Sequence, residues 1–141
     1  MLETPHAILG GAVGAATGNP YWAAPAGFAS HLAGDVLPHW NPSFPFQSKR
    51  LYAFVIADFV LALALVALFY ILWPDRPEIA IGAFFGTLPD IILGIRFTFR
   101  VRWLQWYERA HGFIHHEISL LPGLATQAVV VTISIWYLAN A

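Results

Sequence analysis

Apolar residues along the chain fall into long runs that short polar turns separate. The clearest run covers residues 51–73, and two others cover 79–95 and about 118–138. A helix needs roughly 20 apolar residues to cross the hydrocarbon layer of a membrane. The turn at 74–78 separates the first two runs, and Pro89 is expected to interrupt the second. The pattern therefore predicts three membrane-spanning helices.

The first third of the chain carries two shorter apolar runs, 6–17 and 21–36, both rich in alanine and glycine. The tripeptide Gly18-Asn19-Pro20 between them is a strong turn signal. We interpret the two runs as a helical hairpin that tilts or crosses the membrane only in part, with one interrupted helix as the alternative. A small-residue face suited to close helix packing in lipid comes from Gly10, Gly11 and Gly14.

Aromatic and basic residues mix in two segments, 38–50 and 96–117, as is typical of chain that lies at the headgroup level. These segments hold six of the seven Lys and Arg residues. Because basic loops stay in the cytoplasm, both segments and the N-terminus are predicted to be cytoplasmic. The turns at 18–20 and 74–78 and the C-terminus are predicted to face the other side.

Composition supports a membrane protein, because 58% of the residues are hydrophobic and only 11% are charged. A soluble domain is about half apolar and a quarter charged. We therefore expect one all-α domain over residues 1–141, an integral membrane bundle of about four to five helices that includes the hairpin and an interfacial helix. The net charge of −1 gives no basic surface for nucleic acid. The lack of cysteine excludes disulfides, thiolate ligands and cysteine nucleophiles.

The few ionisable residues near the apolar runs are candidates for function, because such groups are costly at membrane depth. His31 and Asp35 are four residues apart and would share one helix face, and His111 and His115 repeat that spacing. A hydrogen-bonded surface pair is the alternative for each. Pro38 is expected to end the helix before His39. The candidate metal ligands, all near the predicted cytoplasmic ends of their segments, are His6, His31, Asp35, His39, Asp90, His111, His115 and His116.

Imidazole and carboxylate ligands favour zinc, with manganese or iron as alternatives. The candidates outnumber the four ligands of one zinc site, so a two-metal centre that acts on a phosphoester is an alternative. Asp90 or Glu117 would accept the proton of metal-activated water. Ser30 does not face His31 on a helix, so no nucleophilic triad is predicted. The substrate would be a lipid or other phosphoester at the membrane surface.

Other charged residues are given structural roles. Asp58, two turns into its run, is interpreted as a structural residue or as a partner of a ligating histidine, with a ligand or an ion-pair role as alternatives. Thr4 is expected to cap the first helix with Pro5 at its first position. Arginines such as Arg96 and Arg100 anchor the chain to the membrane surface or, alternatively, hold a substrate phosphate.

Three short motifs resemble a known family: His6 in the first apolar run, Leu88-Pro89-Asp90, and Gly112-Phe113-Ile114-His115. They are similar to motifs of the membrane-bound metal-dependent hydrolases, small inner-membrane proteins also described as LexA-binding hydrolases. The resemblance implies a metal-dependent hydrolase of the inner or plasma membrane. The chain departs from the family where Ile91 and Ile92 follow Asp90 in place of an Asp-His pair, and where His116 replaces a serine. The His-x-x-x-Asp spacing also looks like that of zinc-dependent phospholipase C.

Two non-catalytic functions remain as rivals. In the first, a structural metal or a His–Asp network stabilises a membrane scaffold or subunit. In the second, the protein carries a metal ion or a proton across the membrane, which would require ligands deep in the bilayer, where only Asp58 is expected. An open coordination position distinguishes a catalytic metal site from a structural one.

Overall fold

The computed structural model describes residues 1–42 and 48–141. Within these residues the chain is helical, which confirms the predicted all-α class. It forms six α-helices, more than the four to five expected, and one short 3-10 helix. In chain order they are α1 (Glu3–Thr17), α2 (Pro20–Val36), α3 (Lys49–Leu72), α4 (Pro77–Thr98), η1 (Arg102–Leu104), α5 (Gln105–Ile114) and α6 (Leu120–Asn140). Part of the predicted interfacial segment, residues 43–47, lies outside the described residues.

Three of these helices, α3, α4 and α6, are long and apolar enough to cross a membrane. The 24 residues of α3 span about 36 Å. The helices of the hairpin are shorter, with 15 residues in α1 and 17 in α2. Gly18 ends α1 in the left-handed conformation at φ 57°, and the Asn19 side chain caps α2 by accepting a hydrogen bond from the Tyr21 N–H. The hairpin interpretation is therefore right and the single interrupted helix is wrong.

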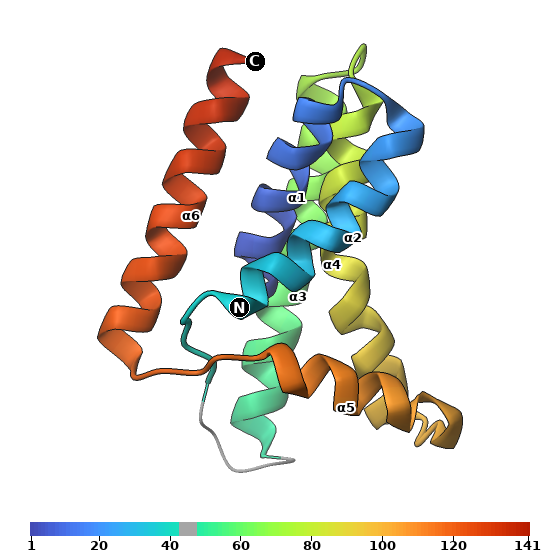
Figure 1. Cartoon of the computed structure of the whole chain (residues 1–141), viewed down its shortest axis with the longest axis vertical. Coiled ribbons are helices and arrows are strands. Elements are labelled where there is room, and N and C mark those ends of the chain that lie inside the picture. Colours follow the sequence, from blue (N-terminus) through green and yellow to red (C-terminus); the bar gives the residue numbers. More distant parts are fainter. Residues whose placement is uncertain (43–47) are drawn as a thin grey trace.

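The ends of the helices fall into two groups at opposite ends of the bundle (Figure 1). One end holds the N-terminus, the start of α3, the end of α4 and the start of α6, and α5 runs crosswise there. The other end holds the hairpin turn, the α3–α4 turn and the C-terminus. Segments that the distribution of basic residues assigns to one side of the membrane therefore share one end of the molecule.

Glycines allow α1, α2 and α4 to approach one another closely. A Cβ atom on Gly10 of α1, or on Gly27 of α2, would collide with the carbonyl oxygen of Gly82 in α4. A Cβ on Gly86 would lie 2.6 Å from the carbonyl oxygen of His6. Because glycine has no side chain at these positions, the backbones pack directly against each other. In lipid such dispersion contacts drive helix association. The predicted small-residue face of the first helix is confirmed.

Pro89 does not interrupt α4, contrary to the prediction. The helix continues through it from Pro77 to Thr98, and Pro89 is buried. Proline removes one backbone hydrogen bond, but the preceding turns of α4 pack tightly on α1 and α2. Tertiary packing contributes more to helix stability than one such bond, so the helix persists.

Asp58 has the structural role that the sequence favoured. Its carboxylate lies at the start of α1, where Oδ2 accepts a hydrogen bond from the Glu3 N–H at 2.7 Å and Oδ1 accepts one from the Thr4 hydroxyl at 2.6 Å. The predicted capping role of Thr4 is wrong, because α1 begins at Glu3 and Pro5 occupies its third position. A carboxylate from α3 satisfies the free N–H groups and favours the positive end of the helix dipole.

We expect Gly82→Ala to destabilise the bundle by about 1–3 kcal/mol, because the added methyl group collides with the backbone of α1. Gly94→Ala is the matched control, since a Cβ there meets no atom within 4 Å. Thermal unfolding in detergent should give a lower Tm for Gly82→Ala and an unchanged or higher Tm for Gly94→Ala. Equal Tm values for the two variants would contradict the close packing.

Single cysteines at the two ends of α3 test the orientation. Arg50 and Asp75 are exposed at opposite ends of this candidate span. In oriented vesicles Arg50→Cys should react with an impermeant maleimide only from the cytoplasmic side, and Asp75→Cys only from the other. Labelling of both from one side would disprove the assignment.

Candidate metal centre

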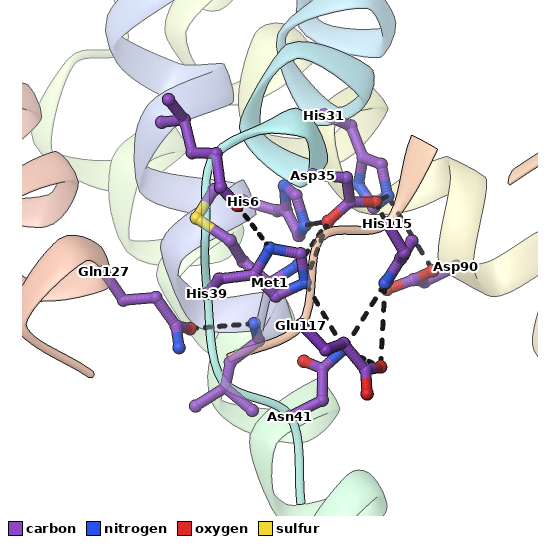
Figure 2. A network of polar contacts seen from close by, with 12 residues as sticks. Met1, His6, His31, Asp35, His39, Asn41, Asp90, His115, Glu117 and Gln127 are labelled. Atoms are coloured by element: carbon purple, nitrogen blue, oxygen red, sulfur yellow. Dashed lines mark hydrogen bonds and ion pairs between the residues drawn. The ribbon is translucent and has the colours of Figure 1, made fainter. Parts of the chain in front are cut away.

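A buried carboxylate, that of Asp35 near the end of α2, lies at the centre of the candidate site and has no exposed surface (Figure 2). Five imidazoles surround it, those of His6, His31, His39, His111 and His115. Its Oδ2 lies 3.0 Å from Nε2 of His111 and 3.0 Å from Nε2 of His115. Its Oδ1 lies 3.1 Å from Nε2 of His6. Both oxygens of one carboxylate therefore face imidazole nitrogens.

On three helices, the closely packed glycines and the candidate ligands lie four residues apart in sequence. Residues four apart share one face of a helix. The steps are 10 to 6 on α1, 27 to 31 to 35 on α2, and 82 to 86 to 90 on α4. On each helix a glycine lies where the helices cross, and a histidine or aspartate lies one turn closer to Asp35 and its imidazoles. Close packing of these faces brings His6, His31 and Asp90 together.

His39 reaches the site from the loop after α2. The helix ends at Val36, one residue before the position that Pro38 predicts. The His39 N–H then donates to the His116 carbonyl at 3.0 Å, and the Ile118 N–H donates to the His39 carbonyl at 2.8 Å. This short parallel bridge joins two loops that are distant in sequence and brings the rings of His39 and His115 to 5.1 Å.

His111 and His115 approach each other as predicted, but not on one helix. α5 ends at Ile114, and His115 follows in an extended conformation. The Nε2 atoms of the two histidines are nevertheless 2.9 Å apart. The chain turns directly after α5, and this turn directs His115 back toward Asp35.

Backbone carbonyls fix which nitrogen of two histidines carries hydrogen. His31 donates from Nδ1 to the Gly86 carbonyl, and His39 donates from Nδ1 to the Leu37 carbonyl, both at 2.7 Å. A carbonyl oxygen can only accept, so the neutral ring presents a lone pair at Nε2. This arrangement orients metal-binding histidines in proteins. Burial also lowers the pKa of His39, which favours its neutral, ligating form.

The Nε2 atom of His31 is buried and has no hydrogen-bond partner among the described residues. It lies 3.2 Å from Oδ2 of Asp35 and 3.7 Å from Oδ1 of Asp90. In the neutral ring this nitrogen directs a lone pair into a region that also holds carboxylate oxygens. Such a set of acceptors is unfavourable without a cation between them. The chemistry of the donor set therefore fits a metal ion.

The charge of the two carboxylates is not balanced by the arginines that form ion pairs in the described part of the chain. Arg76 pairs with Glu78, and Arg96 pairs with Glu108 at 3.1 Å. The α-amino group of Met1 contacts Oδ1 of Asp35. With neutral imidazoles the site would still attract further positive charge. The pairing of Arg96 with Glu108 also favours an anchoring role for this arginine over phosphate binding.

Seven of the eight predicted ligands fall into three overlapping groups whose ligand atoms lie within 4.8 Å of one another. The groups are His6, His31 and Asp90; His31, Asp35 and His111; and Asp35, His39 and His115. His116, the eighth candidate, is outside them: its side chain is exposed and its backbone forms the bridge to His39. Alternation along an extended segment turns it away from its neighbour His115.

Glu117, the second candidate base, lies at the rim of the site. Its side chain is largely exposed, its Oε1 is 3.9 Å from Nδ1 of His115, and it accepts a hydrogen bond from the Asn41 amide at 3.2 Å. The carboxylate therefore approaches the outer nitrogen of a candidate ligand and not the centre of the cluster. From this position it can orient His115 or exchange protons with water.

Three polar residues near the site were not selected from the sequence. Asn41 lies 3.5 Å from both His39 and His115. Gln127 of α6 accepts from the Leu2 N–H and donates to the Trp40 carbonyl, which joins α6 to the site wall. Tyr107 donates to the Pro89 carbonyl, and burial raises its pKa to about 12. Gln127 carried a usable signal, since an amide inside an apolar run commonly bonds across helices.

One edge of the centre is open. The side chains of Asp90 and His115 are 24% and 19% exposed, whereas those of His6, His31 and Asp35 are fully buried. A cavity of about 620 Å³ reaches both Asp90 and His115. A ligand that enters this cavity could therefore meet the site at its open edge, as catalytic metal sites require.

Comparison of the chain with models of protein families, with characterised proteins and with solved structures finds no match.

Protein purified without chelator should contain about one or two divalent ions per chain, as one- or two-metal centres require. His31→Ala and Asp35→Ala should each remove at least one ion, because both residues belong to two of the three ligand groups. His116→Ala is the control and should keep the full content. Elemental analysis measures the ions, and a metal-free wild type whose Tm does not respond to added zinc would refute the metal centre.

Proposed function

We propose that this protein is an integral membrane, metal-dependent hydrolase that cleaves a phosphoester at the cytoplasmic membrane face. The observation that carries the proposal is the buried Nε2 of His31, which presents a lone pair between two carboxylates. A metal ion there would be held by His31 either with His6 and Asp90 or with Asp35 and His111. The family resemblance of the short motifs supports the same activity.

Zinc suits the ligand set best, with manganese and iron as alternatives, because imidazole and carboxylate groups bind all three. Asp35 supports a two-metal centre. Asp35 belongs to two of the three ligand groups, so it would help to hold each ion of a pair. Paired ions stabilise both the attacking and the leaving oxygen of a phosphoryl displacement.

A metal ion in this site would supply activated water, with a pKa lowered toward about 7. Asp90 lies at the open edge, where its carboxylate can bind the ion or take the proton of that water. Water activated in this way would displace the leaving group from phosphorus. Asp90 would take the proton of the water, and Asp90 or solvent would supply a proton to the leaving oxygen. Glu117, at the rim, is the second candidate for this proton transfer.

The three apolar helices support a membrane location, and the distribution of basic residues supports a cytoplasmic position for the site. The site lies at the end of the bundle that carries α5 and the N-terminus (Figure 1). α5 runs crosswise there, with Trp103 and Trp106 exposed nearby as interfacial anchors. A bilayer is thus the partner of the fold, and its cytoplasmic surface is where substrate would be met.

A structural metal centre is the second candidate function. The complete burial of His6, His31, Asp35 and His39 favours it, because closed sites hold structural ions. The open edge at Asp90 and His115 favours catalysis instead. A function as a metal or proton carrier is disfavoured. Such a carrier would need ligands deep in the membrane, and the one candidate expected there, Asp58 of α3, already accepts hydrogen bonds from N–H groups of α1.

Asp90→Asn separates catalysis from scaffolding, because it keeps size and removes charge. For a catalytic site we expect normal insertion and a loss of phosphoester turnover of about 10²–10⁴-fold. Asp75→Asn, in the exposed α3–α4 turn, is the control and should keep full activity. The measurement is hydrolysis of a chromogenic phosphoester by purified protein, with Tm and metal content recorded in parallel.

For a structural site the same substitution would lower Tm or metal content, and the wild type would show no turnover. Unchanged stability, metal content and activity in Asp90→Asn would remove this residue from the site.

A further inference from the structure

The cavity beside the metal centre has two chemically different ends. Its long walls are apolar and come from the site ends of α3 and α4, among them Val55, Phe59 and Ile91. Asp90 and His115 line the same cavity, so its polar end coincides with the open edge of the centre. A volume of about 620 Å³ lies within the range of small-molecule sites, which are mostly apolar with few polar groups.

The walls of the cavity also favour contact with lipid. Both walls belong to helices that are candidate membrane spans. Val55, Ile56 and Ile95 line the cavity and remain 48%, 60% and 44% exposed. In a membrane these side chains face hydrocarbon, so a molecule with an apolar chain can enter from the lipid layer.

We propose that the substrate is a phosphoester with a long acyl or alkyl chain, whose phosphate binds at the metal centre and whose chain occupies this cavity. The proposal rests on the proposed function and adds the substrate class to it. The Asp58 carboxylate also lines the cavity and would repel an anionic head group. The metal end is therefore the end that attracts the phosphate, which orients the molecule.

Gly94 provides a way to fill the cavity without disturbing the fold. It lines the cavity one turn beyond Asp90, and a Cβ atom there would meet nothing within 4 Å. Gly94→Phe should therefore extend into the space of the chain. Ala67→Phe is the matched control, because Ala67 lies between the same two helices at their other end, in a separate apolar hollow lined also by Leu63 and Phe84.

The first experiment compares ethyl, hexyl and decyl esters of 4-nitrophenyl phosphate with metal-loaded protein in nanodiscs. For the wild type and Ala67→Phe, kcat/KM should rise with chain length, by up to about fourfold for each buried methylene. Gly94→Phe should hydrolyse the ethyl ester normally and lose most of the gain for the decyl ester. Equal kcat/KM for all three esters in the wild type would overturn the chain site and leave the hydrolase intact.

If no ester is hydrolysed, the proposed function fails and the chain site is tested by binding. A decyl phosphonate with a diazirine at the chain end should label residues of α3 and α4 that line the cavity. This labelling should saturate, and excess decyl phosphonate should compete for it. Gly94→Phe should abolish it and Ala67→Phe should not. Unsaturable labelling spread over the lipid-facing surfaces, including α6, would show ordinary bilayer contact and overturn the proposal.

Discussion

The carboxylate of Asp35 must be neutralised inside a protein that offers it no exposed surface. Burial of an unpaired carboxylate is strongly unfavourable, so such groups are paired or bind metals. The buried α-amino group of Met1 contacts Oδ1 of Asp35, while Oδ2 faces the imidazoles of His31, His111 and His115. Two of the five imidazoles already donate their Nδ1 hydrogens to backbone carbonyls. The neutral rings then add lone pairs to the negative charge. A divalent ion would satisfy the carboxylate and the rings together, at the point where histidines from four parts of the chain converge on one residue.

The convergence depends on backbone contacts that are too close for any side chain. Gly10 and Gly27 both approach Gly82, and Gly86 approaches the carbonyl of His6. Helices that touch through glycine have axes closer than those separated by larger residues. The side chains one turn beyond each contact therefore lie within a few ångströms of one another. The same helix crossings therefore produce both the close glycine contacts and the arrangement of the candidate ligands one turn further along.

Local rules explain what could be predicted from the sequence. Apolar run length identified the three candidate spans, Gly18 and Asn19 marked the hairpin turn, and Pro38 ended the helix before His39. The four-residue spacing placed His31 beside Asp35. Tertiary contacts decided the rest. Packing kept α4 helical through Pro89, and a backbone bridge between distant loops turned His116 outward. The capping of α1 by Asp58 depends on where α3 lies, which no short-range pattern encodes.

Along α4 the space around each successive turn increases, from tight backbone contact to partial exposure. At Gly82 and Gly86 the neighbouring backbones leave no room for a methyl group. Asp90, one turn further, is partly exposed, and at Gly94 a Cβ atom would meet nothing within 4 Å. The close contacts between α1 and α4 extend as far as His6 and Gly86, and beyond them Glu3 at the start of α1 lines the cavity. The space that α1 leaves, with α3 as its other wall, is the cavity. A helix that carries candidate ligands on one turn and bounds an apolar cavity on the next has the arrangement that the proposed substrate requires.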